Sequence, residues 1–191
     1  LCAAIGLSVP WAANYGAFAE SVLSVKCSYR GQSGYFTPVV FLNSRSSIPA
    51  GREIYGTPKV FADVQVGFDE RVMYTETLVA GTSALSIRST MQREARVEEM
   101  PLMRPAWRLK VIPRADGQGA DLMQLIDTGA TTSDVTIHTC RAGDGVVQFN
   151  PVPTYDLSEF TPLEYLGAYY LEMDYSENYA EIVHDFLSEE K

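Results

Sequence analysis

The 191-residue chain predicts a mainly β (α+β) fold, an antiparallel double-sheet cone or barrel with few short helices. Apolar and polar residues alternate along much of the chain, which is typical of half-buried strands. The expected strands are short and numerous, and turn residues rather than helical crossovers separate them. The length and the 46% hydrophobic composition fit a single domain over residues 1–191 with a sizeable core.

The strands are expected in order along the chain, and turn residues such as Arg30 to Gly34 join them. They cover residues 21–29, 35–42, 60–66, 71–79, 83–91, 106–112, 120–126, 133–140, 146–149 and 164–173. Asp116-Gly117-Gln118-Gly119 and Gly143-Asp144-Gly145 predict hairpin turns within the second half.

Two helices are expected. The first begins at Ser46 or Ser47, has Pro49 in its first turn and ends at Gly56-Thr57-Pro58. The second closes the chain over residues 177–187.

The net charge argues against nucleic acid as a partner, and the short apolar runs argue against a membrane span. The net charge is −9 and no cluster of lysine or arginine offsets it, so nucleic acid is not expected to bind. No segment approaches about 20 uninterrupted apolar residues, so no membrane span is expected. The acidic residues of the last segment predict a solvated face or a rim between subunits; they are Asp156, Glu159, Glu164, Glu172, Asp174, Glu177, Glu181, Asp185, Glu189 and Glu190, against the single basic residue Lys191.

Cysteine and histidine usage indicates neither a metal site nor a disulfide framework. The cysteines Cys2, Cys27 and Cys140 are odd in number, and the two histidines are far apart in sequence. No metal and no other cofactor is therefore expected. Residues 1–7 resemble a signal-peptide core only weakly, because a basic segment and an initiating Met are missing. A cytoplasmic location is the resulting prediction.

The segment from Gly51 to Lys59 contains the most informative motif. Its sequence is Gly-Arg-Glu-Ile-Tyr-Gly-Thr-Pro-Lys, and the apolar residues 60–62 follow it. A lysine amine held against apolar surface loses its proton more readily and can condense with a ketone to give a Schiff base. Gly-Arg-Glu followed by an apolar residue and then by Pro-Lys resembles the signature of the acetoacetate decarboxylase family, which implies that Lys59 forms the iminium.

A second block strengthens the resemblance. Residues 104–113 read Arg-Pro-Ala-Trp-Arg-Leu-Lys-Val-Ile-Pro, and they are similar to the family's pattern arginine-proline-x-aromatic-x-leucine-lysine-x-isoleucine-proline. Upstream, Glu20 lies where the family places an acidic active-site residue. A carboxylate at the start of an apolar strand is costly unless it is paired or transfers protons. The resemblance extends over most of residues 17–187 and implies an acetoacetate decarboxylase-like fold and a homo-oligomer.

The chain departs from the family pattern at two points. Val60 stands where the decarboxylases have a second lysine, so desolvation would have to free the amine without help from an adjacent cation. Only about 0.04% of an ordinary lysine is neutral at pH 7. The family's N-terminal segment, which contributes an arginine to the pocket, is also missing. Arg104 or Arg52 is a candidate to bind the substrate carboxylate instead.

The resemblance implies a carboxy-lyase that decarboxylates acetoacetate or a related 3-oxo acid. Lys59 would form the iminium and Glu20 would assist proton transfer, while Arg52, Glu53, Tyr55, Phe41 and Arg104 are the candidates for binding a small keto-acid substrate. Trp107 and Tyr35 are expected in the core. Two alternatives stay open: an aldolase-dehydratase or cyclase of the same superfamily, and a non-enzymatic barrel that binds a small ligand.

Overall fold

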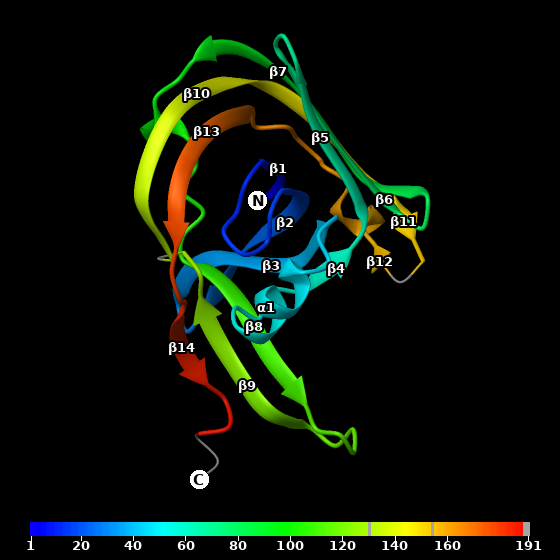
Figure 1. The fold of residues 1–191 in the computed structure, drawn as a ribbon, viewed down its shortest axis with the longest axis vertical. Coiled ribbons are helices and arrows are strands. Elements are labelled where there is room, and N and C mark those ends of the chain that lie inside the picture. The colour runs from blue at the N-terminus through cyan, green and yellow to red at the C-terminus, as the bar shows by residue number, and fades with distance from the viewer. Residues whose placement is uncertain (130, 154, 189–191) are drawn as a thin grey trace.

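The computed structural model describes residues 1–129, 131–153 and 155–188, and strands dominate it. Two sheets curl toward each other into a half-barrel (Figure 1). The strands are β1 (Cys2–Val9), β2 (Phe18–Tyr29), β3 (Gln32–Leu42), β4 (Lys59–Phe61), β5 (Asp63–Asp69), β6 (Val72–Val79), β7 (Thr82–Glu94), β8 (Ala106–Pro113), β9 (Ala120–Asp127), β10 (Thr132–Phe149), β11 (Pro151–Val152), β12 (Tyr155–Asp156), β13 (Ala168–Glu177) and β14 (Glu181–Asp185). The helices are α1 (Ser47–Glu53) and the 3-10 turns η1 (Val97–Glu99) and η2 (Ser158–Phe160).

The larger sheet has the strand order β1-β2-β3-β8-β9-β14. Its neighbours are antiparallel except at β3, which pairs in parallel with β8 near its start and with β4 near its end. Because β2 occupies the other edge of β3, β4 and β8 follow one another along the same edge. This arrangement brings the lysine-containing strand β4 next to the strand from the second sequence block.

The smaller sheet has the order β13-β10-β7-β6-β5 and is antiparallel throughout. In Figure 1, β10 and β13 form the outer arc and the N-terminal hairpin of β1 and β2 is seen inside it. The main core lies where the two sheets face each other. Its buried members are Ala19, Leu23, Val39, Phe41, Ala62, Val64, Leu85, Phe149 and Leu157.

The period-two alternation decides which face of β2 each residue occupies. Ala19 and Leu23 point into the core, and between them the buried Ser21 Oγ lies 2.7 Å from Thr77 Oγ1 of the smaller sheet. Glu20 and Val22 therefore point to the opposite face of the larger sheet. That face is partly covered by α1.

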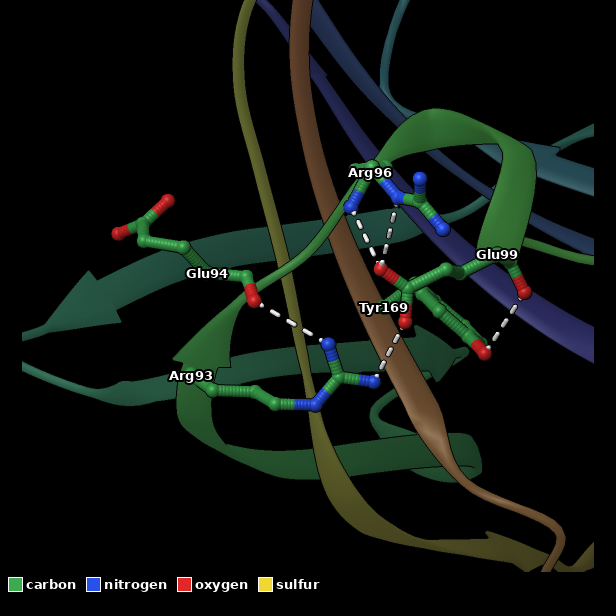
Figure 2. A network of polar contacts seen from close by, with 5 residues as sticks. All are labelled: Arg93, Glu94, Arg96, Glu99 and Tyr169. Atoms are coloured by element: carbon green, nitrogen blue, oxygen red, sulfur yellow. Dashed lines mark hydrogen bonds and ion pairs between the residues drawn. The ribbon is translucent and has the colours of Figure 1, made fainter.

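A surface network joins β13 to the segment that follows β7 (Figure 2). Arg93 Nη2 donates to Glu99 Oε2 at 2.7 Å, and the backbone N–H of Arg96 donates to Glu99 Oε1 at 2.9 Å. Tyr169 of β13 completes the network by donating its hydroxyl to the Glu99 carbonyl oxygen at 2.9 Å. These hydrogen bonds from Arg93 and Arg96 lower the pKa of Glu99.

The structure confirms the predicted fold class and the first helix. The chain is mainly strand. Helix α1 begins after Ser46 and ends before Gly56-Thr57-Pro58. Trp107 is buried, with 2% of its surface exposed. Residues 2–7 of the segment that weakly resembles a signal-peptide core belong to β1. Among the described residues no helix is long and apolar enough to cross a membrane.

Two predicted elements are wrong. Gly143-Asp144-Gly145 forms no turn, because β10 continues through it as one 18-residue strand. A Cβ on Gly143 would lie 1.9 Å from the Thr90 carbonyl oxygen of β7, so this glycine permits close strand packing instead. The expected closing helix over 177–187 is also incorrect. β14 pairs there with the free edge of β9, and this tertiary pairing outweighs local helix preference.

Candidate active site

Lys59 opens β4, directly after the loop that leaves α1. The Lys59 N–H donates to the Thr57 carbonyl oxygen at 2.7 Å, and the Val40 N–H donates to the Pro58 carbonyl oxygen at 3.1 Å. These bonds fix the start of β4 beside β3, where Lys59 is paired with Val40. The lysine side chain therefore extends from the face of the larger sheet that lies away from the core, and only 16% of it is exposed.

Gly51 of α1 makes room for the lysine stem. A Cβ at this position would lie 2.4 Å from Lys59 Cδ and 2.8 Å from Lys59 Cε. Such distances are well inside van der Waals contact, so the methylene chain of Lys59 lies directly on the helix backbone. The Gly-Arg-Glu motif thus has a packing role: its glycine lets α1 cover the lysine and direct the amine along the sheet.

Glu20 is the immediate partner of the amine. Its Oε2 lies 3.4 Å from Lys59 Nζ, and each side chain is 16% exposed. The Phe18 ring, two residues earlier on the same side of β2, has its centroid 5.8 Å from Nζ. Oε2 is buried and has no hydrogen-bond partner among the described residues. The pair is thus a half-buried ion pair whose carboxylate retains free accepting capacity.

A second carboxyl group acts on the pair from the end of β13. Burial raises the pKa of Glu177, Lys59 lowers it and Glu20 raises it, so Glu177 lies within electrostatic range of both. Burial, followed by the charges of Glu177 and Glu20, also raises the pKa of Tyr175. Tyr175 keeps 41% of its surface exposed, so its ring lies at the surface rather than in the core.

Tyr55 connects the end of β13 to the loop that carries Lys59. Its hydroxyl donates to the Asn178 carbonyl oxygen at 3.2 Å, which ties the segment after α1 to the connection between β13 and β14. Burial, and after it the charge of Glu177, raises the pKa of Tyr55. The link positions Glu177 opposite the loop that carries Lys59.

Arg108 contributes a second cation. It lies on β8, and burial lowers its pKa to about 10, although the charges of Glu20 and Asp127 act in the opposite direction. Its Nη1 donates to the Trp107 carbonyl oxygen at 2.9 Å. The site therefore combines two cations, Lys59 and Arg108, with Glu20 and the less acidic carboxyl of Glu177.

The structure brings together some of the sequence-predicted site residues. Lys59, Glu20 and Tyr55 gather at the site as described. Arg52 is exposed and its Nη1 donates to the Lys59 carbonyl oxygen at 3.2 Å, so it supports the loop from outside. Glu53 is exposed at the end of α1.

Phe41 and Arg104 lie elsewhere. Phe41 is buried in the main core, with its ring 5.6 Å from that of Tyr155, on the sheet face opposite to Lys59. Arg104 is exposed, and its Nη2 donates to Thr132 Oγ1 at 3.0 Å. Neither contacts the Lys59–Glu20 pair.

Sequence reasoning missed Arg108, Glu177 and Tyr175. Glu177 is exposed, as the expected solvated rim requires, but its charge also acts on Lys59 and Glu20; Glu189, Glu190 and Lys191 lie outside the described residues. Arg108 gave no signal, because it is the expected polar member of a regular alternation between Trp107 and Leu109. Glu177 and Tyr175 gave none, since their place depends on how β13 curves.

The described residues contain no group of three or more histidine, cysteine, aspartate or glutamate side chains arranged to hold a metal ion. The three cysteines are free thiols. Two hollows of about 240 Å³ and about 430 Å³ lie on the smaller sheet, lined by residues such as Gln92 and Tyr169 in one and Arg88 and Tyr165 in the other. Neither is lined by the Lys59–Glu20 pair.

The lysine–carboxylate pair lies on a curled, mostly antiparallel half-barrel. Known protein families and solved structures share this fold. Residues 2–187 match the profile of the family described as acetoacetate decarboxylase. The chain belongs to the acetoacetate decarboxylase family. At the level of the family this makes it a carboxy-lyase-like enzyme.

Relatives with assigned names share about a quarter of their residues with this chain. It is 27% identical over 188 residues to acetoacetate decarboxylase 3 of Mesorhizobium japonicum, covering 96% of this chain and 72% of that protein. It is 24% identical over 191 residues to the acetoacetate decarboxylase of Chromobacterium violaceum, and the match covers 95% of this chain and 74% of that protein.

Solved structures share the fold. The crystal structure of acetoacetate decarboxylase from Legionella pneumophila superposes with a TM-score of 0.88 at 23% identity, covering 97% of this chain and 74% of that chain. The enduracididine biosynthesis enzyme MppR, complexed with pyruvate, superposes with a TM-score of 0.74 at 16% identity, and the match covers 90% of this chain and 68% of that chain. Both likenesses concern the fold.

Proposed function

We propose that this chain is a Schiff-base-forming lyase that decarboxylates acetoacetate or a related 3-oxo acid through an iminium on Lys59. The observation that carries the proposal is the half-buried pair of Lys59 and Glu20, 3.4 Å apart, on the sheet face beneath α1. An amine and a carboxylate so placed supply the nucleophile and the proton-transfer group that imine chemistry needs.

In the proposed reaction the uncharged amine of Lys59 attacks the keto carbon of the substrate. The proton taken up by Glu20 is returned to the hydroxyl of the resulting carbinolamine, which then loses water and becomes an iminium cation. The electron pair of the bond to the carboxylate then moves into this cation, carbon dioxide leaves and an enamine remains. Protonation at carbon and hydrolysis by water release the ketone and regenerate Lys59.

Glu20 fits the proton transfers of this sequence. Its Oε2 has no hydrogen-bond partner among residues 1–129, 131–153 and 155–188 and lies beside the reacting nitrogen, so it is able to take a proton from the amine and return one later. The Phe18 ring and the backbone of α1 at Gly51 limit access of water to the nitrogen. Substrate-binding roles for Arg52, Glu53, Tyr55, Phe41 and Arg104, a homo-oligomer and a cytoplasmic location stay predictions from the sequence.

Borohydride reduction in the presence of acetoacetate tests the proposal. Reduction traps an imine as a stable amine, so we expect a mass increase on the peptide that contains Lys59. Lys59→Arg keeps the positive charge but forms no imine, and it should lose the adduct together with about 1,000-fold or more of the carbon dioxide release. Lys26→Arg, at an exposed lysine of β2, is the matched control and should retain both.

The outcomes separate the competing functions. An adduct on Lys59 with pyruvate, without carbon dioxide release from acetoacetate, would favour an aldolase-dehydratase or cyclase that shares the imine. Absence of any adduct would favour a ligand-binding barrel. An adduct on another lysine would refute the assignment of the site.

A further inference from the structure

The guanidinium of Arg108 is buried beside the Lys59–Glu20 pair without a full set of partners. A guanidinium has five N–H donors. Among the described residues, one hydrogen bond is formed, from Nη1 to the carbonyl oxygen of the preceding Trp107, while Nε is buried with no partner. A buried cation with an unpaired donor costs free energy that packing alone does not return. A functional reason for its presence is therefore needed.

Sheet register places Arg108 on the same face as Lys59. Val25 is paired with Phe36 and Phe36 with Trp107, so these three side chains share the face that carries the core. Arg108 follows Trp107 on β8 and points the other way. Lys59, paired with Val40 further along β3, also extends from that second face.

The loop before β4 brings the two strands together. Gly56 packs so closely on β8 that a Cβ there would lie 2.7 Å from Lys110 Cα. Lys110 is two residues from Arg108 on β8, and Lys59 is three residues from Gly56. Lys59 and Arg108 therefore extend from the same face of the larger sheet, on β4 and β8, and the charge of Glu20 at the start of β2 acts on Arg108.

The nearby carboxylates leave Arg108 available. Asp127 Oδ1 accepts the backbone N–H groups of Ala106 at 2.9 Å and Gly129 at 2.7 Å, so it is engaged with the turn after β9. Glu20 is paired with Lys59. Both charges act on Arg108 from a distance, but neither carboxylate occupies its Nε.

We propose that Arg108 binds the carboxylate of the keto acid that condenses with Lys59, and so selects anionic over neutral carbonyl compounds. The inference rests on the proposed Schiff-base function. Nε and one terminal nitrogen of a guanidinium match the two oxygens of a carboxylate in a bidentate contact. This contact forms with the bound substrate and is lost as carbon dioxide leaves, so it acts on substrate binding more than on turnover.

Two ketones that differ only in the carboxylate provide the test. Levulinate and 2-pentanone are both methyl ketones, and levulinate has a carboxylate where 2-pentanone has a methyl group. Borohydride trapping on Lys59 is followed by intact mass over a range of concentrations. For the wild-type chain, half-maximal trapping should require much less levulinate than 2-pentanone.

Three variants isolate the contribution of Arg108. Arg108→Met should raise the levulinate concentration for half-maximal trapping by about 10- to 100-fold, the value of one or two charge-assisted hydrogen bonds, and leave 2-pentanone unchanged. Arg108→Lys should recover part of the preference for levulinate, because lysine keeps the positive charge but cannot form the bidentate contact of a guanidinium. Arg114→Met removes an exposed arginine, paired with Asp116, from the same hairpin and should behave as wild type.

The results distinguish the two proposals. Failure of the wild-type chain to form an adduct with either ketone refutes the Schiff-base function. Normal adducts with an unchanged preference for levulinate in Arg108→Met overturn the role of Arg108 alone. Equal loss of both adducts in that variant, with a lower thermal midpoint, would also overturn it, because Arg108 would then support the fold. A raised KM for acetoacetate with a smaller change in kcat supports it.

Discussion

Two polar clusters of the molecule differ in how completely their groups are paired. In the surface network around Glu99, both carboxylate oxygens and the backbone carbonyl oxygen accept hydrogen bonds, from Arg93, Arg96 and Tyr169 (Figure 2). At the candidate active site, Glu20 Oε2 and Arg108 Nε are buried and have no hydrogen-bond partner within the described part of the chain. The exposed cluster is complete, whereas the half-buried one is not.

Burial makes this difference informative. Arg93 is 55% exposed, so water would satisfy its donors even without Glu99, and completing the network gains little free energy. Lys59 and Glu20 are each 16% exposed, where an unpaired polar atom is costly. Unsatisfied groups persist at functional sites because a ligand or a reaction step uses them. The incomplete cluster is therefore where we propose that substrate binds.

After the loss of Lys59 itself, the largest effect is expected from Glu20→Gln. The amide keeps the size of the side chain but transfers no protons, so turnover should fall by about 100- to 1,000-fold. Imine formation on Lys59 should persist, since the amine loses its paired charge but not its position. Steady-state carbon dioxide release and borohydride trapping, measured on the same samples, separate the two steps.

Glu94→Gln is the matched control for Glu20→Gln. Glu94 is also an ion-paired carboxylate, 3.1 Å from Arg141, but 75% of its side chain is exposed. We expect turnover to be unchanged in this variant. Equal losses in the two variants would remove the distinction between the complete and the incomplete cluster.

A smaller effect is expected from Gly51→Ala. The added Cβ would overlap Lys59 Cδ, so the flexible lysine stem must shift away from α1. Misplacing the amine by about 1 Å should slow trapping by about 10- to 100-fold. Thermal stability should change little, because alanine favours the helix by about 1 kcal/mol while the crowding opposes it.

Gly145→Ala provides similar crowding away from the site. Its Cβ would lie 2.7 Å from Ser89 Oγ on the smaller sheet. This variant should lower the thermal midpoint and leave the rate of trapping on Lys59 unchanged. Unaltered trapping in Gly51→Ala would mean that the helix does not direct the lysine.

The sequence predicted the parts of the structure that depend on local pattern. Alternation gave most strands, and Pro49 marked the first turn of α1, because its backbone restriction acts locally, although Ser46 forms no side-chain capping hydrogen bond. Lys59 and Glu20 were identified by a family resemblance, and register then accounts for their meeting. Both flank β3 and extend from the same face.

Other features depended on partners far along the chain. The close approach of β7 turns Gly143 from an apparent turn residue into part of a continuous strand. Phe41 is adjacent to β4, yet the two-residue period directs it into the core. Glu177 is exposed, as composition predicted, but composition does not reveal that β13 brings its charge within electrostatic range of Lys59.

The smallest expected effects concern the pH dependence of stability, where the two clusters should have opposite signs. Hydrogen bonds from Arg93 and Arg96 lower the pKa of Glu99 below its ordinary value of 4.5. The folded chain therefore gains stability from ionised Glu99 above that value and loses it as pH falls through the lowered pKa. Burial raises the pKa of Glu177, so ionising Glu177 at higher pH costs the folded chain stability.

Urea unfolding between about pH 4 and pH 8 tests this contrast. Glu99→Gln should lower the midpoint near neutral pH, and its difference from wild type should shrink toward the acid end. Glu177→Gln should raise the midpoint near neutral pH, because it removes a carboxylate that burial disfavours, and this gain should also vanish below the ordinary pKa. Glu164→Gln, at an exposed position, serves as the control. A loss of stability in Glu177→Gln at neutral pH would show that Lys59 compensates the burial of Glu177 fully, and the site would then hold a satisfied ion triad like the surface network.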